Sequence, residues 1–365
     1  MSFTLPQYHE PDFQETRFQS APEARFEPAP KDGVAPEGYH ATTIYPEYFK
    51  VGGRWLLAEE SRMDCVAALR DGKIAAVEFR NLKAGEPVAV GRTEDASEGI
   101  YVYPFGFAEE KGEAETFAFR QGRSRETAYS MDYDSIYELL RHEKDHGKIL
   151  WVMGPACAFD HDARSAFAAL VRGGYVHGLL AGNALATHDL EASYLGTALG
   201  QDIYTQRSQP NGHYHHLDVL NRVRRSGSIP QFIQDYHIDN GILYGCVKHN
   251  IPFVLTGSIR DDGPLPEVYA DAYQGAYAMR SLVRGATTVI CLATMLHTIA
   301  AGNMTPSFRV LPDGTVRPVY LYAVDADEFV VNKLRDRGSL CATTMVTNVQ
   351  DFITKVARDL GVYPK

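Results

Sequence analysis

Apolar segments of strand length alternate with helical patterns from residue 148 to residue 360, and this alternation constrains the fold more than any other feature. Segments of strand type include "KILWVMGPA" (148–156), "IPFVLTGS" (251–258) and "VRPVYLYAVD" (316–325), and "DARSAFAALVRGG" (162–174) is one of the helical patterns. Strands that alternate with helices predict a parallel sheet with helices on both faces. Because these strands show no polar–apolar alternation, they fit a sheet that is buried on both sides. We therefore predict an α/β domain over residues 131–365.

The N-terminal part of the chain differs in character. Residues 41–130 contain short β-prone runs, among them "RWLLAEE", "EPVAVG" and "GIYVYPFGF", which are separated by turns with Gly, Asp and Lys. Several short strands at close spacing predict a smaller β-rich domain, either a barrel or a sandwich. Residues 1–40 have many Pro, Glu and Gln residues and little periodicity, so we expect an extended arm that wraps the body or a neighbouring subunit.

Composition excludes several classes of protein. The formal net charge of −10 gives no indication of a nucleic-acid-binding surface. The five cysteines are scattered without a C-x-x-C pair, which argues against a disulfide framework or a zinc ribbon and fits reduced thiols in the cytoplasm. The first residues lack the basic and apolar regions of a signal peptide, so none is expected. No apolar run reaches the roughly 18 residues that a membrane span requires.

Small or polar residues follow five of the expected strands. In open α/β sheets, ligands bind outside the carboxyl ends of the strands, so this recurrence predicts a binding site there. The alternative for several of these residues is that each one caps the helix that follows it. The five positions are Gly182-Asn183-Ala184, Ser258 to Gly263, Ala293 to His297, Asp325, and Thr347-Asn348.

Asp325 is the most informative of these positions. It ends an apolar strand, and in nucleotide-binding sheets a carboxylate at such a position accepts hydrogen bonds from ribose hydroxyls. The usual Gly-x-Gly-x-x-Gly turn is absent from the sequence. A pyrophosphate can still bind to backbone amides at a helix N-terminus, since the helix dipole and the free N–H groups do not depend on that motif.

Histidines cluster in "NGHYHHLDVLNRVRR", which contains His213, His215 and His216. A metal site requires histidine and carboxylate ligands at defined spacing, and neighbouring residues on a helix point in different directions. Proton transfer by a neutral histidine and plain packing at the start of a helix are the other two interpretations. Cys246 is either a nucleophile or, as is usual for a buried cysteine, inert.

The stretch "GSIRDDGPLPEV" places Arg260, Asp261 and Asp262 in consecutive positions at the end of an apolar strand. The planar guanidinium of Arg260 suits a substrate carboxylate. Asp261 and Asp262 suit an amino group, a proton transfer or a nicotinamide ribose. An internal Arg–Asp pair, with the second Asp capping the next helix, is the alternative. Ligand-binding residues concentrate on loops of this kind, so we favour a site.

Five motifs together resemble the LOR/SDH-type family, which includes the archaeal ornithine cyclodeaminases and the C-terminal part of the cyanobacterial bifunctional arginine dihydrolase/ornithine cyclodeaminases. The motifs are "AGNALATHDLE", "GHYHHLDVLNRVRRSGSI", "GSIRDDGPLPEV", "MLHTIAAGN" and "KLRDRGS". The resemblance implies a Rossmann-like fold. It also implies an NAD-dependent enzyme that converts L-ornithine to L-proline and ammonia without net redox change, and a homo-oligomer that acts on a small amino acid.

The resemblance also assigns cofactor contacts. Asp325 would contact the ribose, and Asn348 with Val349 would line the adenosine side. The other NAD contacts would be Asn183, Ala184, Asp262, Thr294, Met295, Leu296 and His297. No metal ligand is implied.

For catalysis we expect Asp261 to act as the base or to bind the distal amine of the substrate, with His216 and His297 as alternatives for the base. Arg260 would bind the carboxylate, unless Arg222 or Lys333 does so.

The sequence departs from the family pattern at three places, which we expect to flank the pocket and to bear on the choice of substrate. Residues 159–162 replace an apolar-His-Thr-Gly run, and the insertion "RVLPDGTV" (309–316) lengthens the connection before Asp325. Asn348 stands where an aspartate is more usual. Two rival functions follow: a net oxidoreductase that acts on an opine-like secondary-amine amino acid, and an NAD-binding regulatory protein without turnover.

Overall fold

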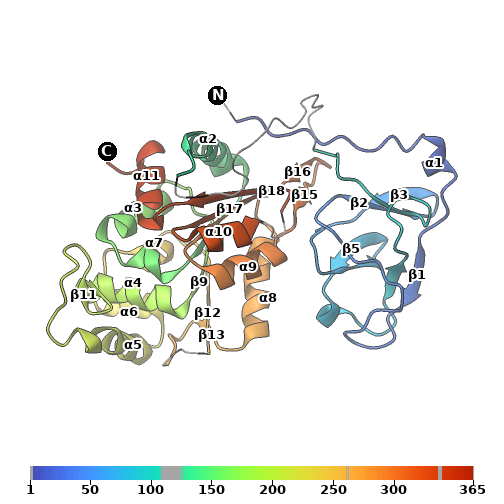
Figure 1. Cartoon of the computed structure of the whole chain (residues 1–365). Coiled ribbons are helices and arrows are strands. Elements are labelled where there is room, and N and C mark those ends of the chain that lie inside the picture. The colour runs from blue at the N-terminus through green and yellow to red at the C-terminus, as the bar shows by residue number, and fades with distance from the viewer. Residues whose placement is uncertain are drawn as a thin grey trace.

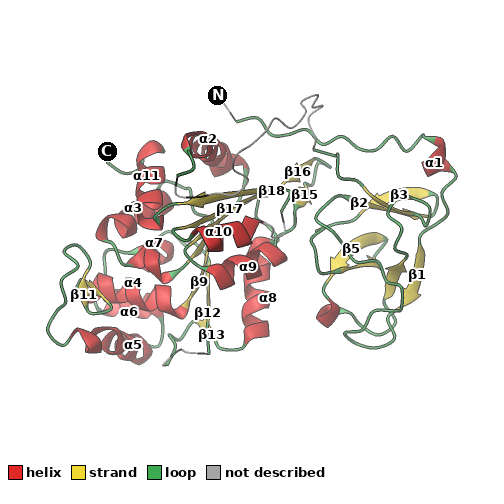
Figure 2. Cartoon of the chain, in the orientation of Figure 1, coloured by secondary structure: helices red, strands yellow, loops and turns green. Residues whose placement is uncertain are grey.

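The protein is described by a computed structural model that covers residues 3–107, 124, 126–259, 261, 263–335 and 339–364. Two regions are visible: a β-rich region built from the first third of the chain, and an α/β region built from the rest (Figure 1, Figure 2). Within the described part, no helix has the length and hydropathy that a bilayer crossing requires.

The α/β region contains a seven-stranded sheet in which every pairing is parallel. Its order is β13-β12-β9-β8-β14-β17-β18. Apart from the short edge strand β13, this is the order 3-2-1-4-5-6 of the Rossmann fold. The prediction of a Rossmann-like parallel sheet is therefore confirmed. The strands are β8 (Ile149–Met153), β9 (Gly178–Gly182), β12 (Phe253–Thr256), β13 (Val268–Tyr269), β14 (Thr288–Leu292), β17 (Tyr320–Asp325) and β18 (Cys341–Val346).

Helices cover both faces of this sheet, which explains why its strands are apolar throughout. In β8, Trp151 packs in one buried cluster with α2, α3, α4 and α11, whereas Leu150 and Val152 pack in a second cluster with α8 and α9. Adjacent strand residues thus enter different cores. The helices of the two layers are α2 (Ser130–His146), α3 (His161–Arg172), α4 (Asn183–Leu195), α8 (Ala272–Val283), α9 (Met295–Met304) and α11 (Val349–Asp359).

The remaining elements of this region are short and connect the layers. They are η2 (Pro155–Ala158), β10 (Thr197–Ala198), β11 (Gln201–Asp202), η3 (Gly212–Tyr214), α5 (His215–Ser226), α6 (Ile229–Asp235), α7 (Ile242–Lys248), β15 (Phe308–Val310), β16 (Val316–Pro318) and α10 (Glu328–Arg335).

The β-rich region consists of two antiparallel sheets that share one core. Phe49 and Ile100 from the three-stranded sheet pack with Ala67, Ile74 and Ala89 from the four-stranded sheet. Backbone hydrogen bonds also join the two sheets, since the amide of Glu59 donates to Ile74 at 2.7 Å and that of Ala24 to Lys50 at 2.9 Å. The sheets have the orders β1-β6-β4-β5 and β3-β2-β7, formed by β1 (Arg25–Pro28), β2 (Glu47–Val51), β3 (Arg54–Leu57), β4 (Val66–Arg70), β5 (Lys73–Val77), β6 (Pro87–Val90) and β7 (Ile100–Val102), with η1 (Phe79–Asn81) after β5.

Residues 3–40, the described part of the expected arm, lie in two environments. Residues 3–15 run along the molecule from the α/β region, where Phe3 contacts His142 and Tyr320, to the β-rich region, where Phe13 stacks on Trp55 (Figure 1). After α1 (Thr16–Gln19), the chain forms β1, which pairs with β6 inside the four-stranded sheet. The second half of the arm is thus a strand of the β-rich region, while the domain boundaries at residues 40 and 130 stay predictions.

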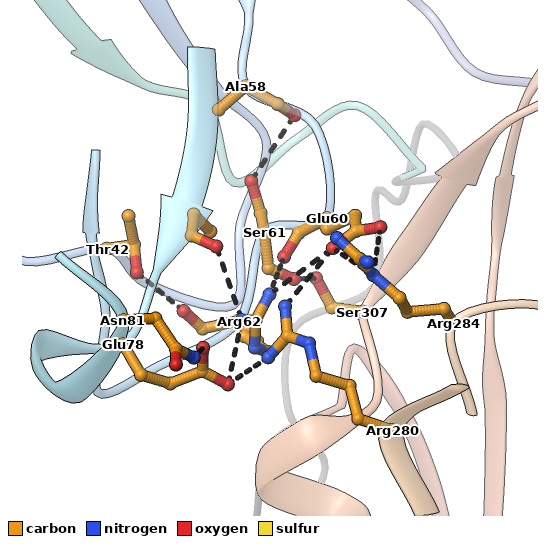
Figure 3. Close-up of polar contacts among 11 residues, drawn as sticks. Thr42, Ala58, Glu60, Ser61, Arg62, Glu78, Asn81, Arg280, Arg284 and Ser307 are labelled. Carbon is orange, nitrogen blue, oxygen red and sulfur yellow. Dashed lines mark hydrogen bonds and ion pairs between the residues drawn. The ribbon is translucent and has the colours of Figure 1, made fainter. Parts of the chain in front are cut away.

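Charged side chains join the two regions (Figure 3). Arg62 is fully buried in the β-rich region and lies 3.1 Å from the carboxylate of Glu78. The same carboxylate pairs with Arg280 of α8, and Glu60 pairs with Arg284 just after that helix at 2.9 Å. Removing one partner would leave a buried charge uncompensated, so this network couples the position of α8 to the β-rich region.

The insertion at residues 309–316 does not flank the expected pocket. It forms most of the β15–β16 hairpin, which precedes the amino end of β17, whereas the pocket was expected at the carboxyl ends of the strands. The hairpin is tied to the amino edge through buried Arg317, whose guanidinium donates to Glu143 of α2 at 2.6 Å. The expectation failed because α9 carries the chain back across the sheet before the insertion begins.

We predict that Glu143→Ala destabilises the protein by about 3–5 kcal/mol, because it leaves the buried guanidinium of Arg317 unpaired. Glu143 also accepts hydrogen bonds from Thr287 and Thr288 at the start of β14. Urea unfolding measures the change. The control is Glu138→Ala on the same helix, which removes an exposed pair with Arg141 and should cost at most about 1 kcal/mol. An equal decrease in the free energy of unfolding in the two variants would contradict the prediction.

Candidate functional site

The sheet has a topological switch point between β8 and β14, where the connections leave in opposite directions. Here the backbone segments after the two strands touch: the amide of Gly154 donates to the carbonyl of Leu292 at 2.8 Å. A Cβ at position 154 would lie 2.0 Å from the carbonyl oxygen of Ala293, so only glycine fits. Ala293 itself has φ +48, the left-handed region that a non-glycine residue rarely adopts. In open α/β sheets the crevice at this point binds the ligand.

The structure brings most of the predicted cofactor residues to this edge. Asn183 and Ala184 begin α4 directly after β9, Asp325 ends β17, and Val349 begins α11 after β18. The segment 294–297 opens α9 after β14, and Met295 and Leu296 expose 40% and 73% of their surface. Large apolar side chains so exposed at the mouth of a crevice are available to a ligand.

Two of the helices that start at this edge have no side-chain cap. The N-cap residues are Gly182 for α4 and Thr294 for α9, and neither accepts a capping hydrogen bond through its side chain. Their first backbone N–H groups therefore remain available to an anion. The helix α11 differs, because Asn348 caps it by accepting hydrogen bonds from the amides of Gln350 and Asp351. Asn348 therefore caps the helix that follows it, which is the alternative to a binding role at this position.

His297 links two strand ends. Its Nε2 lies 2.6 Å from the hydroxyl of Thr256 at the end of β12, and its Nδ1 lies 3.2 Å from the hydroxyl of Thr294. A Cβ at Gly182 would meet the ring at 3.1 Å, so β9 also approaches it closely. Burial lowers the pKa of His297, which favours the neutral ring. With both nitrogens engaged, His297 is better suited to fix the edge than to act as the base.

Asp325 has one carboxylate oxygen engaged and one available. Its Oδ1 accepts a hydrogen bond from the amide of Asp327 at 3.0 Å. Oδ2 has no hydrogen-bond partner within the described residues. Asp325 also lies near the thiol of Cys157, whose pKa is raised mainly by complete burial and further by this carboxylate. The free oxygen at the end of β17 suits the ribose-binding role expected of it.

Asp261 is bonded to its own loop. Its Oδ2 accepts from the amide of Ser258 at 2.7 Å and its Oδ1 from the hydroxyl of the same residue at 3.2 Å. Both oxygens are thus engaged locally, which weakens the case for Asp261 as the base. Arg260 and Asp262, the predicted carboxylate and NAD contacts, lie outside the described residues.

The second half of the loop between β12 and β13 is hydrogen-bonded to three helices. Asn183, which does not cap α4, accepts from the amide of Leu265 at 3.0 Å through its side chain. Arg224 of α5 donates to the carbonyl of Pro264 at 3.5 Å. The carboxylate of Glu267 accepts a hydrogen bond from the backbone amide at the start of α6. Asn183 therefore has a loop-positioning contact that the sequence pattern did not reveal.

Four other candidates each have different surroundings. Arg222 stacks over Tyr194 and Tyr236, and Lys333 lies exposed on α10. His216 lies in the first turn of α5, beside His188. Cys246 is fully buried, and burial raises the pKa of its thiol, so the nucleophile interpretation has no support.

Sequence reasoning missed one polar cluster. Glu191 and His188 on α4, Thr197 on β10 and His215 on α5 form a hydrogen-bonded network. The spacing of His188 and Glu191, one helical turn apart, was the only local signal. No group of three metal-ligating side chains occurs in the part of the chain that the structure describes.

Comparison with known proteins places these features in a family. Residues 135–356 match the family described as arginine dihydrolase ArgZ-like, C-terminal, Rossmann fold. The chain is 41% identical over 340 residues to an ornithine cyclodeaminase from Archaeoglobus fulgidus, covering 92% of this chain and 79% of that protein.

Solved structures agree with this match. A LOR/SDH protein from Methanococcus maripaludis S2 superposes with a TM-score of 0.84 at 34% identity, covering 93% of this chain and 98% of that one. The ternary complex of AgrE with ornithine and NAD+ superposes with a TM-score of 0.59 at 34% identity. In that case 94% of this chain matches only 46% of the other, so the chain corresponds to about half of AgrE.

We predict that stability falls below neutral pH through His297. Because its pKa is lowered in the folded state, the unfolded chain binds a proton first as the pH drops below the ordinary value of about 6.5. The free energy of unfolding then decreases as the pH falls, until the pH reaches the pKa of His297 in the folded state. Urea unfolding between about pH 8 and pH 5 should show a smaller loss for His297→Gln than for the wild type. His142 and His177, whose pKa values are also lowered by burial, contribute equally to both proteins. Identical pH profiles would refute the role of His297.

Proposed function

The chain belongs to the ornithine cyclodeaminase family of the archaeal and ArgZ-like type, and on this premise we propose that it converts L-ornithine to L-proline and ammonia with NAD as its cofactor. The observation that carries the proposal is the carboxyl edge of the sheet. This edge carries a glycine-only contact at the switch point, two helix N-termini without a side-chain cap, and the available oxygen of Asp325.

The residues at this edge fit NAD. The uncapped starts of α4 and α9 suit the pyrophosphate, since their N–H groups and dipoles favour an anion. Asp325 suits a ribose diol, and the exposed side chains of Met295 and Leu296 suit an apolar ring. Bound NAD would supply a reversible hydride acceptor for the α-carbon of the substrate.

The protein has three tasks in this reaction. It must fix the substrate against the cofactor, exclude water from the imine, and remove a proton from the α-ammonium before the hydride can leave. The loop that contains Asp261 is the candidate for the first task, because Asn183 and Arg224 attach it to α4 and α5 beside the crevice. Closure of the ring and loss of ammonia would leave a cyclic imine, and only the return of the hydride would restore the starting oxidation level.

The proposal predicts ammonia and proline in equal amounts from L-ornithine with substoichiometric NAD. Many turnovers per NAD are expected, without lasting absorbance of reduced nicotinamide, because the hydride is returned in each cycle. An absorbance change proportional to product would instead support the rival oxidoreductase acting on a secondary-amine amino acid. Binding of NAD without any turnover of diamino acids would support the regulatory alternative. Proline and ammonia are measured by chromatography and a coupled assay.

We further predict that Asp325→Ala weakens NAD binding by about 10- to 100-fold. A hydrogen bond to a charged group contributes about 1.5–3 kcal/mol, and each 1.4 kcal/mol is a factor of about ten. The variant should also discriminate less against NADP, because its extra phosphate no longer meets a carboxylate. Calorimetry measures both affinities. The control is Asp313→Ala, an exposed turn residue in the hairpin at the opposite edge, which should bind NAD as the wild type does. Unchanged affinity in Asp325→Ala would exclude the ribose role.

A further inference from the structure

Glu191 is a carboxylate without solvent exposure that accepts four hydrogen bonds. Its Oε1 accepts from the hydroxyl of Thr197 and the amide of Gly200, both at 2.9 Å. Its Oε2 lies 3.0 Å from Nδ1 of His188 and accepts from the amide of Leu199 at 3.1 Å. Burial alone would raise the pKa of Glu191, but the bonds from His188, Gly200 and Thr197 outweigh it and lower the pKa. The carboxylate is therefore ionised and can only accept hydrogen bonds.

An ionised Glu191 fixes the tautomers of two histidines. Because the carboxylate can only accept, His188 must donate from Nδ1, which leaves its Nε2 as the basic nitrogen. The single hydroxyl proton of Thr197 goes to Glu191, so Thr197 must accept from Nδ1 of His215 at 2.7 Å. A carboxylate that orients an imidazole through Nδ1–H is the arrangement of acid–base histidines in enzymes.

The Nε2 of His188 has no hydrogen-bond partner among the described residues and is not fully buried. His188 as a whole is 9% exposed. The ring lies against Phe159 at 5.4 Å and His216 at 6.2 Å between centroids. Phe159 directly follows η2, the 3-10 helix that leaves β8 at the switch point. The ring of His188 therefore packs against the connection that leaves β8 at the switch point.

The other candidate bases are less suited. Both oxygens of Asp261 are engaged by Ser258, and both ring nitrogens of His297 are engaged by threonine hydroxyls. His216 has no carboxylate partner among the described residues. His188 alone among the four combines a carboxylate on one nitrogen with an open position on the other.

We propose that His188 is the acid–base residue of the cyclodeaminase reaction and that Glu191 is its positioning residue. This inference rests on the proposed function. The α-ammonium group of the substrate gives one proton to Nε2 of His188, and the N–H electron pair stays on the substrate nitrogen. The imidazolium keeps its Nδ1–H bonded to Glu191, whose negative charge stabilises it. The same proton returns to the nitrogen that departs as ammonia, so none is consumed. The ring of Phe159 lies against His188 and places an aromatic wall beside this proton transfer.

Kinetics of two variants and a control test the proposal. General acid–base catalysis contributes about 10²- to 10⁴-fold, so His188→Asn should lower kcat at least about 100-fold while the KM for ornithine and the affinity for NAD change little. His213→Asn, an exposed histidine of η3, is the control and should keep wild-type kinetics. Wild-type kcat in His188→Asn would overturn the proposal.

The pH profile separates positioning from a merely structural role. The titratable groups around His188 are Glu191 on its own helix, His216 on α5 and, through Thr197, His215. Glu191→Gln removes the charge that favours the imidazolium, so the acid limb of kcat/KM should move to lower pH. An acid limb at the wild-type position in Glu191→Gln would overturn the role of Glu191.

A spectroscopic measurement decides the tautomer without any turnover. Nitrogen-15 NMR of histidine-labelled protein should show His188 as the Nδ1–H tautomer in the wild type and a mixture in Glu191→Gln. An Nε2–H tautomer in the wild type would overturn the proposal even if Glu191→Gln fails to fold. If the wild type releases no ammonia from ornithine, the proposed function fails, and the role of His188 fails with it. Wild-type activity that persists in His188→Asn overturns only the role of His188.

Discussion

The close contact between the segments after β8 and β14 is the constraint on which the rest of the α/β region depends. At this point the sheet reverses its direction of winding, and the amide of Gly154 bonds to the carbonyl of Leu292. No side chain can intervene, because a Cβ at Gly154 would overlap the carbonyl of Ala293. Two helix N-termini and the end of β17 at Asp325 thereby lie at one edge of the sheet, without the glycine-rich motif that usually marks such sheets.

Buried charges fix the elements around this edge. Asp189 of α4 pairs with Arg164 of α3 at 2.9 Å and accepts from the first amides of α7. Glu191, one half-turn later on the same helix, accepts from Thr197 of β10, whose hydroxyl also bonds His215 of α5. Each carboxylate has its hydrogen bonds satisfied by atoms from several elements, so the geometry of α4 depends on all of them at once. Buried carboxylates of this kind are weak evidence for a gain in stability, but their bonds specify one arrangement of the helices and strands around them.

The sequence grouped the candidate residues at one sheet edge, but it did not give their contacts. Asn183, Asp325 and His297 were singled out because each follows an apolar strand, and the parallel sheet brings all three to one edge. Their contacts could not be derived: Asn183 bonds the loop at Leu265, and His297 joins Thr256 to Thr294. Asp261 was favoured as a base from its neighbours in the chain, yet its oxygens bond Ser258, a local contact that competes with any role toward substrate.

By itself, the sequence determined the fold class, the parallel sheet and the family, because apolar periodicity and long motifs are properties of the chain read in order. Only the tertiary structure decided which side chains meet. Thr197 and His215 bond although 18 positions separate them, and Glu143 meets Arg317 across more than half of the α/β region. The insertion at residues 309–316 looked close to the site along the chain, but a helix carries it to the opposite edge of the sheet. Contacts of this kind depend on the direction in which each helix packs back against the sheet. That direction cannot be read from a local sequence pattern.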